Sequence, residues 1–154
     1  MEAKVLVVSD GVAAGEREDS SGRSLRGRLA SADFVVKDAR VIPDGSDSVA
    51  GALREMCEDF AGLVLTTGGT GFGPRDLTPE GTLAVLDRLA PGIAEATRAI
   101  SPKGRLSRAV AGTVGRCLVI NLPGSPGGAV ECLEAVLDVV PHALALLAGE
   151  PTPH

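Results

Sequence analysis

The chain has 154 residues, of which 44% are hydrophobic and 23% are charged, proportions typical of a globular domain with a sizeable core. Its net charge of −5 and its pI near 5.0 argue against broad binding to nucleic acid or to anionic membranes, because both need a basic face. With no Trp or Tyr and only three Phe, the chain offers few aromatic surfaces on which a base could stack.

The three cysteines, Cys57, Cys117 and Cys132, show neither zinc-ligand spacing nor a disulfide framework. Each lies in an apolar stretch of a predicted helix or strand, which favours a place in the core. The first apolar run, residues 5–8, is too short for a signal peptide, and no segment is long enough to cross a bilayer. We therefore expect a single domain over residues 1–154 that works in the reducing cytoplasm.

Apolar, β-branched runs alternate with amphipathic segments in the first half of the chain, which predicts alternating strands and helices. The expected elements are a strand at 4–9, a mobile polar loop at 12–22, a helix at 21–30, a strand at 34–42, a helix at 47–60 and a strand at 63–65. The helix at 47–60 carries Val49, Leu53, Cys57 and Phe60 on one face, as a helix that covers a sheet should.

The second half continues the alternation with less regular spacing. The expected elements are helices at 79–89 and 92–100, a loop at 101–115 with room for a short strand, a strand at 116–121, a glycine-rich turn at 122–128 and a last helix after it. Pro141 would break or kink this last helix. The last helix is apolar on more than one face, so it is either deeply buried or part of a contact between subunits.

Strands that alternate with helices imply an α/β fold with a mostly parallel sheet covered on both faces, which makes three layers. In such sheets, ligands bind beyond the carboxyl ends of the strands. Four segments follow directly after predicted strands: Asp10, Asp44, residues 68–76 and residues 121–128. At one edge of the sheet they would form a single site with three carboxylates and two glycine-rich turns.

The segment LVLTTGGTGFGPRDLTPE, residues 63–80, is the most informative stretch of the chain. Four of residues 68–73 are glycines, which permit positive φ and let a ligand approach the backbone closely. Thr78 as N-cap and Pro79 at the first helical position predict a helix start. A strand, a glycine loop and a helix N-terminus together favour an anion site built from backbone N–H groups. Arg75 would bind a phosphate there, and Asp76 a metal ion.

Other interpretations of these residues stay open. Glycine-rich loops also occur as plain turns between a strand and a helix, and neither the P-loop pattern nor the fingerprint G-x-G-x-x-G is present. Arg75 could equally be a solvated surface residue, and the turn carboxylates could cap helices. His142 in the apolar last helix and His154 in the tail are poorly placed to act as acid–base catalysts.

Several motifs resemble those of the molybdenum-cofactor biosynthesis domain. This is the family of molybdopterin adenylyltransferases, bacterial MoaB-type proteins and the gephyrin and plant Cnx G domains. The motifs are VVSD near the start, VIPD, TTGGTGFGPRDLTPE, RLSR and INLPGSPGGAVECLEAVLDVVPHALALL. They cover almost the whole chain in the family's order.

The resemblance implies an α/β/α sandwich that assembles as a homotrimer. It also implies transfer of AMP from Mg-ATP to the phosphate of molybdopterin, with release of pyrophosphate. Mg²⁺ is then the cofactor, ATP and molybdopterin are substrates, and a molybdate-insertion enzyme is a candidate partner. The same domain occurs in non-catalytic MoaB-type binding or scaffold proteins, so a second function stays open. The choices between trimer and hexamer, and between molybdenum and tungsten, stay open as well.

By motif, the resemblance gives the catalytic positions to Asp44, Asp76 and Ser107, with Asp44 and Asp76 as Mg²⁺ ligands. It also implies these positions for binding nucleotide or molybdopterin: Ser9, Asp10, Thr67, Gly68, Gly69, Thr70, Gly71, Arg75, Asn121, Pro123, Gly124 and Ser125. Two residues depart from the family's pattern. Arg105, where Met is frequent, should alter the pterin side of the pocket. Gly81, where Ala is usual, should weaken its helix by about 1 kcal/mol.

Overall fold

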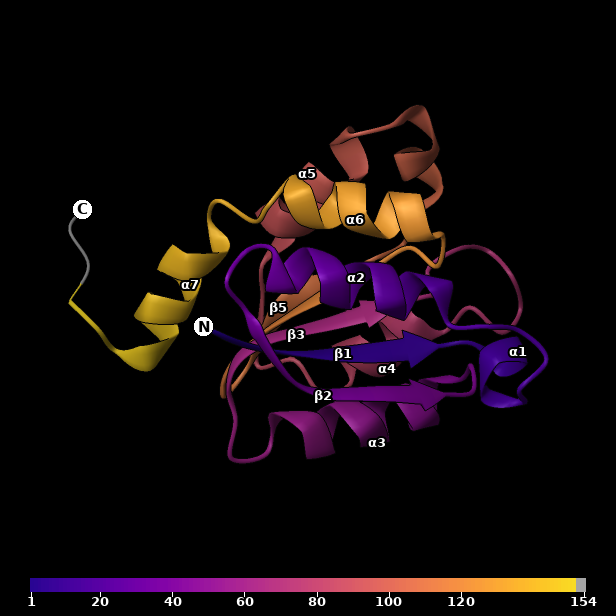
Figure 1. Ribbon diagram of the computed structural model, residues 1–154, viewed down its shortest axis with the longest axis horizontal. Coiled ribbons are helices and arrows are strands. Elements are labelled where there is room, and N and C mark those ends of the chain that lie inside the picture. Colours follow the sequence, from indigo (N-terminus) through magenta and orange to yellow (C-terminus); the bar gives the residue numbers. More distant parts are fainter. Residues whose placement is uncertain (152–154) are drawn as a thin grey trace.

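A computed structural model describes residues 1–151, and its centre is a six-stranded sheet in the order β2-β1-β3-β6-β5-β4 (Figure 1). The strands are β1 (Glu2–Val8), β2 (Val35–Ile42), β3 (Ala61–Thr67), β4 (Arg88–Leu89), β5 (Ala111–Val114) and β6 (Arg116–Leu122). The first three and β6 are parallel, whereas β5 and β4 join antiparallel. The predicted α/β fold with a mostly parallel sheet is confirmed.

Helices cover both faces of the sheet, which makes the three layers visible in Figure 1. One face carries α2 (Ser20–Ala30), α5 (Pro91–Ala99) and α6 (Pro126–Glu134), and the other carries α3 (Ser46–Cys57) and α4 (Thr78–Leu83). The short α1 (Asp10–Ala13) follows the carboxyl end of β1, and a 3₁₀ helix, η1 (Pro102–Leu106), follows α5. The last helix, α7 (Val140–Ala148), packs near the amino ends of β3 and β6.

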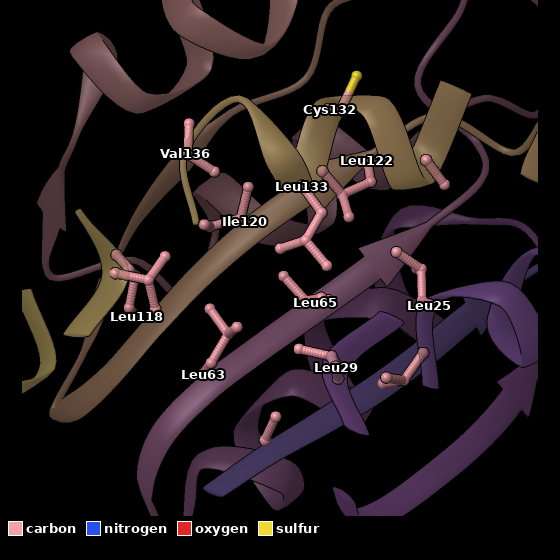
Figure 2. Close-up of a cluster of buried hydrophobic side chains, with 14 of the residues drawn as sticks. Leu25, Leu29, Leu63, Leu65, Leu118, Ile120, Leu122, Cys132, Leu133 and Val136 are labelled. Carbon is pink, nitrogen blue, oxygen red and sulfur yellow. The ribbon is translucent and has the colours of Figure 1, made fainter. Parts of the chain in front are cut away.

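Successive residues of the central strands point to opposite faces of the sheet, so each strand contributes side chains to two buried clusters. Figure 2 shows the larger cluster, in which leucines of α2 and α6 meet Leu63, Leu65, Leu118, Ile120 and Leu122 of β3 and β6. On the other face, Val64 and Val119 pack with Leu53 and Met56 of α3. Full burial of each such side chain stabilises the fold by about 1.5–3 kcal/mol. The buried clusters on both faces of the sheet therefore hold the central strands, and with them their carboxyl ends, in place.

The cysteines are free thiols, and Cys117 and Cys132 are buried as predicted, whereas Cys57 is partly exposed. The pKa of the Cys57 thiol is raised, mainly by a hydrogen bond with Cys117 and to a smaller extent by burial. Burial raises the pKa of Cys132 to about 11. Cys57 and Cys132 are thus protonated at neutral pH, which suits a packing role better than a nucleophilic one.

Three predicted elements were wrong. The loop at 12–22 is partly helical, because Ser9 caps α1 through the Val12 N–H and Asp19 caps α2 through the Gly22 N–H. The last helix is two helices, so the break expected at Pro141 exists but lies before it, at residues 135–139; Pro141 itself is in the first turn of α7, where its missing N–H costs nothing. The helix predicted at 79–89 ends at Leu83, because residues 88–89 pair with β5 instead.

The helix start at α4 also differs from the prediction. Leu77, not Thr78, is the N-cap residue, and no side chain caps this helix. Thr78 is the first helical residue; it is fully buried, and its hydroxyl donates to the Gly68 carbonyl oxygen at 2.8 Å. The hydroxyl therefore fastens α4 to the glycine loop, a contact that the local sequence pattern does not reveal.

We expect Gly81→Ala to destabilise the protein, although Ala is the better helix former by about 1 kcal/mol. A Cβ at position 81 would lie 2.5 Å from the Ser46 carbonyl oxygen and 2.7 Å from Val49 Cβ, so α4 and α3 would have to separate. Overpacking of about 2–3 kcal/mol then outweighs the gain in propensity and leaves a net loss of about 1–2 kcal/mol. Urea denaturation would measure this loss.

Gly51→Ala in α3 is the matched control for that substitution. A Cβ at position 51 meets no atom within 4 Å, so the change should raise the free energy of unfolding by up to about 1 kcal/mol. A stabilised Gly81→Ala variant would show that α4 is not held close to α3 in solution.

Candidate active site

A cavity of about 550 Å³ opens at the carboxyl ends of β1 and β3. The chain runs from β1 to β2 on one side and from β3 toward β4, β5 and β6 on the other, and open α/β sheets bind ligands at such a switch point between neighbouring strands. The cavity wall holds eight of the predicted site residues: Ser9, Asp44, Thr67, Gly68, Gly69, Asp76, Gly124 and Ser125. The fold thus brings the two carboxylates predicted to bind metal to one cavity.

A second cavity, of about 270 Å³, adjoins the first, because Ser125 lines both. Its wall includes three more predicted residues: Ser107, Asn121 and Pro123. The predicted residues that line neither cavity are Asp10, Thr70, Gly71 and Arg75. Two adjoining cavities suit a reaction that joins two ligands, with one ligand in each.

The first two glycines of the loop are required by packing. Gly68 and Gly69 have φ angles of +103° and +65°, which disfavour any residue with a Cβ. A Cβ at Gly68 would overlap the Val8 carbonyl oxygen, and a Cβ at Gly69 would overlap the Thr78 hydroxyl. The prediction linked these glycines to a ligand, whereas the fold alone already demands them.

The side chains of Asp10 and Asp44 each accept a hydrogen bond from the backbone N–H of the other residue, which fixes the end of β2 beside the start of α1. The Asp10 N–H donates to Asp44 Oδ2 at 2.8 Å, and the Asp44 N–H donates to Asp10 Oδ1 at 3.0 Å. Arg75 closes on the same pair, with Nε 2.6 Å from Asp10 Oδ2 and a terminal nitrogen 2.7 Å from the Asp44 carbonyl oxygen. Its hydrogen bond lowers the pKa of Asp10. Arg75 is thus paired with a carboxylate, and its role as a phosphate ligand stays a prediction.

Asp76 shapes the glycine loop and also reaches the cavity. Its Oδ2 accepts a hydrogen bond from the Gly73 N–H at 2.8 Å, and its own N–H donates to the Gly73 carbonyl oxygen at 3.0 Å. Within residues 1–151, no three His, Cys, Asp or Glu side chains form a metal cluster. Two carboxylates on one wall nevertheless suit Mg²⁺, which proteins usually hold by one or two carboxylates together with substrate phosphates and water.

The helix N-termini at the cavity are those of α6 and α2. Ser125 and Pro126 of α6 and Ser20 and Ser21 of α2 line the wall, whereas Thr78 of α4 does not. No side chain caps the first N–H groups of α6, so they can donate to an anion. The uncapped start of α6, a nine-residue helix, therefore lines this cavity together with Gly68 and Gly69 of the predicted loop, whereas the start of α4 does not; the anion site itself stays a prediction.

Sequence reasoning missed the segment between α1 and α2, which was expected to be a mobile loop. Arg17 and Glu18 from this segment line the first cavity, and Arg17 is the one basic residue on that wall. The missed signal was Asp19, a cap residue directly before Ser20 and Ser21. This cap orders the segment that brings Arg17 to the wall of a cavity also lined by Asp44 and Asp76.

Asn121 is a structural centre as well as a cavity residue. Only 1% of its surface is exposed, and its Nδ2 donates to the hydroxyls of Thr66 and Thr82, each at 2.9 Å. Its Oδ1 accepts from the Val110 N–H at 3.2 Å. The side chain thereby links β3, α4 and the segment before β5.

Comparison with known proteins identifies the family of the chain. Residues 4–144 match the family model described as "Probable molybdopterin binding domain". The chain is 38% identical to the molybdopterin adenylyltransferase of Escherichia coli over 94% of this chain and 84% of that protein. It is 37% identical to the molybdopterin adenylyltransferase of Helicobacter pylori over 94% of this chain and 86% of that protein.

A crystal structure of the molybdopterin biosynthesis enzyme MoaB from Thermus thermophilus superposes with a TM-score of 0.90. It is 46% identical to this chain and covers 97% of it, and the match spans 98% of that chain. Among residues 1–151, no helix combines the length and apolarity that a membrane span requires. From the family match and the shared fold together, the chain belongs to the molybdenum-cofactor biosynthesis family of molybdopterin-binding domains.

Proposed function

We propose that this protein is a Mg-ATP-dependent molybdopterin adenylyltransferase. The observation that carries the proposal is the pair of adjoining cavities, because Asp44 and Asp76 line one and Ser107 lines the other. Ser125 belongs to both walls, so ligands in the two cavities would meet beside it. Relatives named molybdopterin adenylyltransferase cover nearly the whole chain and give the chemical identity of the two ligands.

In the proposed reaction, an oxygen of the molybdopterin phosphate attacks the α-phosphorus of ATP. A new P–O bond forms, the bond from the α-phosphorus to the oxygen bridging it to the β-phosphorus breaks, and its electrons leave with pyrophosphate. The attacking phosphate is already largely ionised at neutral pH, so no general base is needed. No His lines either cavity, and His142 lies on α7 near the opposite end of the strands; His154 lies outside the described residues.

The task of the protein is then to neutralise and orient phosphate groups. Asp44 and Asp76 would hold Mg²⁺, which when bound would offset negative charge where the two anions meet. The backbone N–H of Gly69, which lines the first cavity, and the N–H groups of the α6 N-terminus would orient phosphate oxygens, whereas the Gly68 N–H already donates to the Leu122 carbonyl oxygen. Arg17, which lines the same cavity, would add a positive charge. Ser107 would contact molybdopterin in the second cavity.

A second function remains, that of a non-catalytic MoaB-type protein that binds molybdopterin. It rests on the motifs that this chain shares with MoaB-type proteins, and the chain is 46% identical to the MoaB structure, which is itself described as a biosynthesis enzyme. Incubation with molybdopterin and Mg-ATP separates the two. Adenylylated molybdopterin and one equivalent of pyrophosphate are expected from the enzyme, whereas binding without product would identify the second function.

We also propose that the protein acts in the cytoplasm and passes its product to a molybdate-insertion enzyme. The free state of all three cysteines supports a reducing compartment. The product would be a diphosphate ester, on which such an enzyme would act.

For the assembly we propose a homotrimer. Val139 and Leu146, beside and within α7, remain 48% and 51% exposed in the single chain, and large apolar patches mark interfaces. Light scattering at micromolar concentration should give about three times the chain mass of 15.6 kDa. A mass of one chain would remove this proposal, and twice the trimer mass would indicate a hexamer.

A further inference from the structure

Arg108 joins the segment after η1 to the glycine loop. Its Nε donates to the Gly71 carbonyl oxygen at 2.7 Å, and its terminal nitrogens donate to the Asp76 carbonyl oxygen and to the Glu80 carboxylate. The Arg108 N–H also donates to the Thr70 carbonyl oxygen at 2.9 Å. One residue thus binds both ends of the loop and the first turn of α4.

Thr78 closes the base of the loop, because its N–H donates to the Gly69 carbonyl oxygen at 3.1 Å and its hydroxyl to that of Gly68. The other bonds within the loop are local, so its tip depends on outside contacts. Gly73 and Asp76 bond to each other, and the Leu77 N–H donates to the Arg75 carbonyl oxygen. In the described part of the chain, side-chain hydrogen bonds from Arg75 hold the loop toward Asp10 and Asp44, and those from Arg108 hold it from the other side. The guanidinium groups of Arg75 and Arg108 therefore hold the backbone around Asp76 from two sides.

The geometry of these contacts needs an arginine. The acceptors are two carbonyl groups and one carboxylate that lie in different directions, and a guanidinium presents five N–H donors in a fixed plane. A lysine ammonium is a single point of charge and cannot reach all three together. The hydrogen bond from Arg108 also holds the pKa of Glu80 below its ordinary value, so the pair is charged at neutral pH.

We propose that Arg108 is a positioning residue for both cavities. It holds the backbone of Asp76 at the first cavity, while its neighbour Ser107 lines the second. This inference rests on the proposed function, because it assigns Arg108 to the placement of groups that act in adenylyl transfer. Since Arg108 lines neither cavity, it acts through other residues and does not touch the ligands.

The test compares Arg108→Met, Arg108→Lys and Glu80→Gln with Arg40→Met as the control. Arg40 is a matched control because it pairs with Asp38 and Glu55 at similar exposure, 37% for its side chain against 31% for that of Arg108. It lies on β2 and lines neither cavity. The readouts are kcat, KM for ATP and for molybdopterin, the Mg²⁺ concentration for half-maximal rate, and amide hydrogen exchange of residues 70–76 without ligand.

For Arg108→Met we expect kcat to fall about 10²-fold, the usual effect of a misplacement near 1 Å, while both KM values change less than about threefold. The half-saturating Mg²⁺ concentration should rise, because Asp76 would no longer be held in place. Exchange in residues 70–76 should accelerate about tenfold or more as two carbonyl contacts are lost. Arg108→Lys should lie between Arg108→Met and the parent, Glu80→Gln should lose less than about tenfold in kcat, and Arg40→Met should match the parent in all readouts.

Two results would overturn the inference. The first is an Arg108→Met enzyme with parental kcat and parental exchange at residues 70–76. The second is an acceleration of exchange spread evenly over the whole chain in both Arg108→Met and the milder Arg108→Lys, which would show that Arg108 stabilises the fold in general and does not place the loop. If the parent protein forms no adenylylated product, the proposed function fails, and exchange in the ligand-free protein still decides the placement of the loop.

Discussion

Asp76→Asn is expected to turn over molybdopterin about 10²–10³-fold more slowly than the parent, a loss of roughly 3–4 kcal/mol of transition-state stabilisation. Asp76 lies on the wall of the first cavity with Asp44, where two phosphate groups would meet. Asn keeps the shape of the side chain but removes the negative charge that would hold Mg²⁺. The measurement is kcat with saturating ATP and molybdopterin, repeated over a range of Mg²⁺ concentrations.

The fold should tolerate this change. Asn can accept the hydrogen bond that Asp76 Oδ2 now accepts from the Gly73 N–H, so the free energy of unfolding should change by no more than about 0.5 kcal/mol. Asp87→Asn is the matched control, because Asp87 accepts a similar bond from the Gly115 N–H at 2.6 Å and lines neither cavity. Full activity of Asp76→Asn would show that the carboxylate shapes the loop and plays no part in the reaction.

The strands and the site edge could be predicted because their signals are local. The apolar runs that became β1, β3 and β6 are short and bounded by polar or glycine-rich turns, so their places are readable from the sequence, although β1 begins two residues earlier than predicted and β3 extends two residues beyond each predicted end. Parallel order then places the loops after those strands at one edge. That step rests on general properties of α/β sheets and needs no knowledge of side-chain contacts.

What could not be predicted depends on contacts between distant residues. β4 has two residues and exists because it pairs with Gly112 and Thr113, about 25 positions further along the chain. The role of Gly81 depends on its distance from Ser46. The sequence does not reveal that Arg108 contacts the glycine loop, because its partners Gly71 and Asp76 lie more than 30 positions away in the chain.

The glycine loop was correctly predicted to lie at the site, but the reason given for two of its glycines was incomplete. The sequence indicated that Gly68 and Gly69 leave space for a ligand, and they do lie on the cavity wall. Their Cα atoms, however, lie so close to Val8 and Thr78 that the fold excludes larger residues whether or not a ligand binds. Substitutions at these two glycines would therefore change both the stability of the fold and the binding of ligand. Asp76→Asn is expected to change activity with little effect on stability.

Asn121→Ala is expected to lower the free energy of unfolding by about 3 kcal/mol or more, because buried polar groups that lose their partners cost about 1–3 kcal/mol each. The substitution removes two donors from the hydroxyls of Thr66 and Thr82 and the acceptor from the Val110 N–H. Thr82 keeps one bond, since its hydroxyl donates to the Thr78 carbonyl oxygen at 2.8 Å. Urea denaturation with an unchanged m-value would measure the loss. A variant as stable as the parent but unable to bind molybdopterin would make Asn121 a ligand contact.

Asn121→Asp turns the same network into a test that depends on pH. A carboxylate at this 1% exposed position cannot donate to Thr66 or Thr82, and burial disfavours its charge, so its folded-state pKa should lie above the unfolded value of about 3.9. Between these two pKa values the folded state binds more protons than the unfolded state, and stability falls as pH rises. Near pH 4 the protonated carboxyl can donate one hydrogen bond and restore part of the network. We therefore expect the stability difference between Asn121→Asp and the parent to be smallest near pH 4 and to grow toward pH 7, whereas a solvated side chain in contact with ligand would give no such trend.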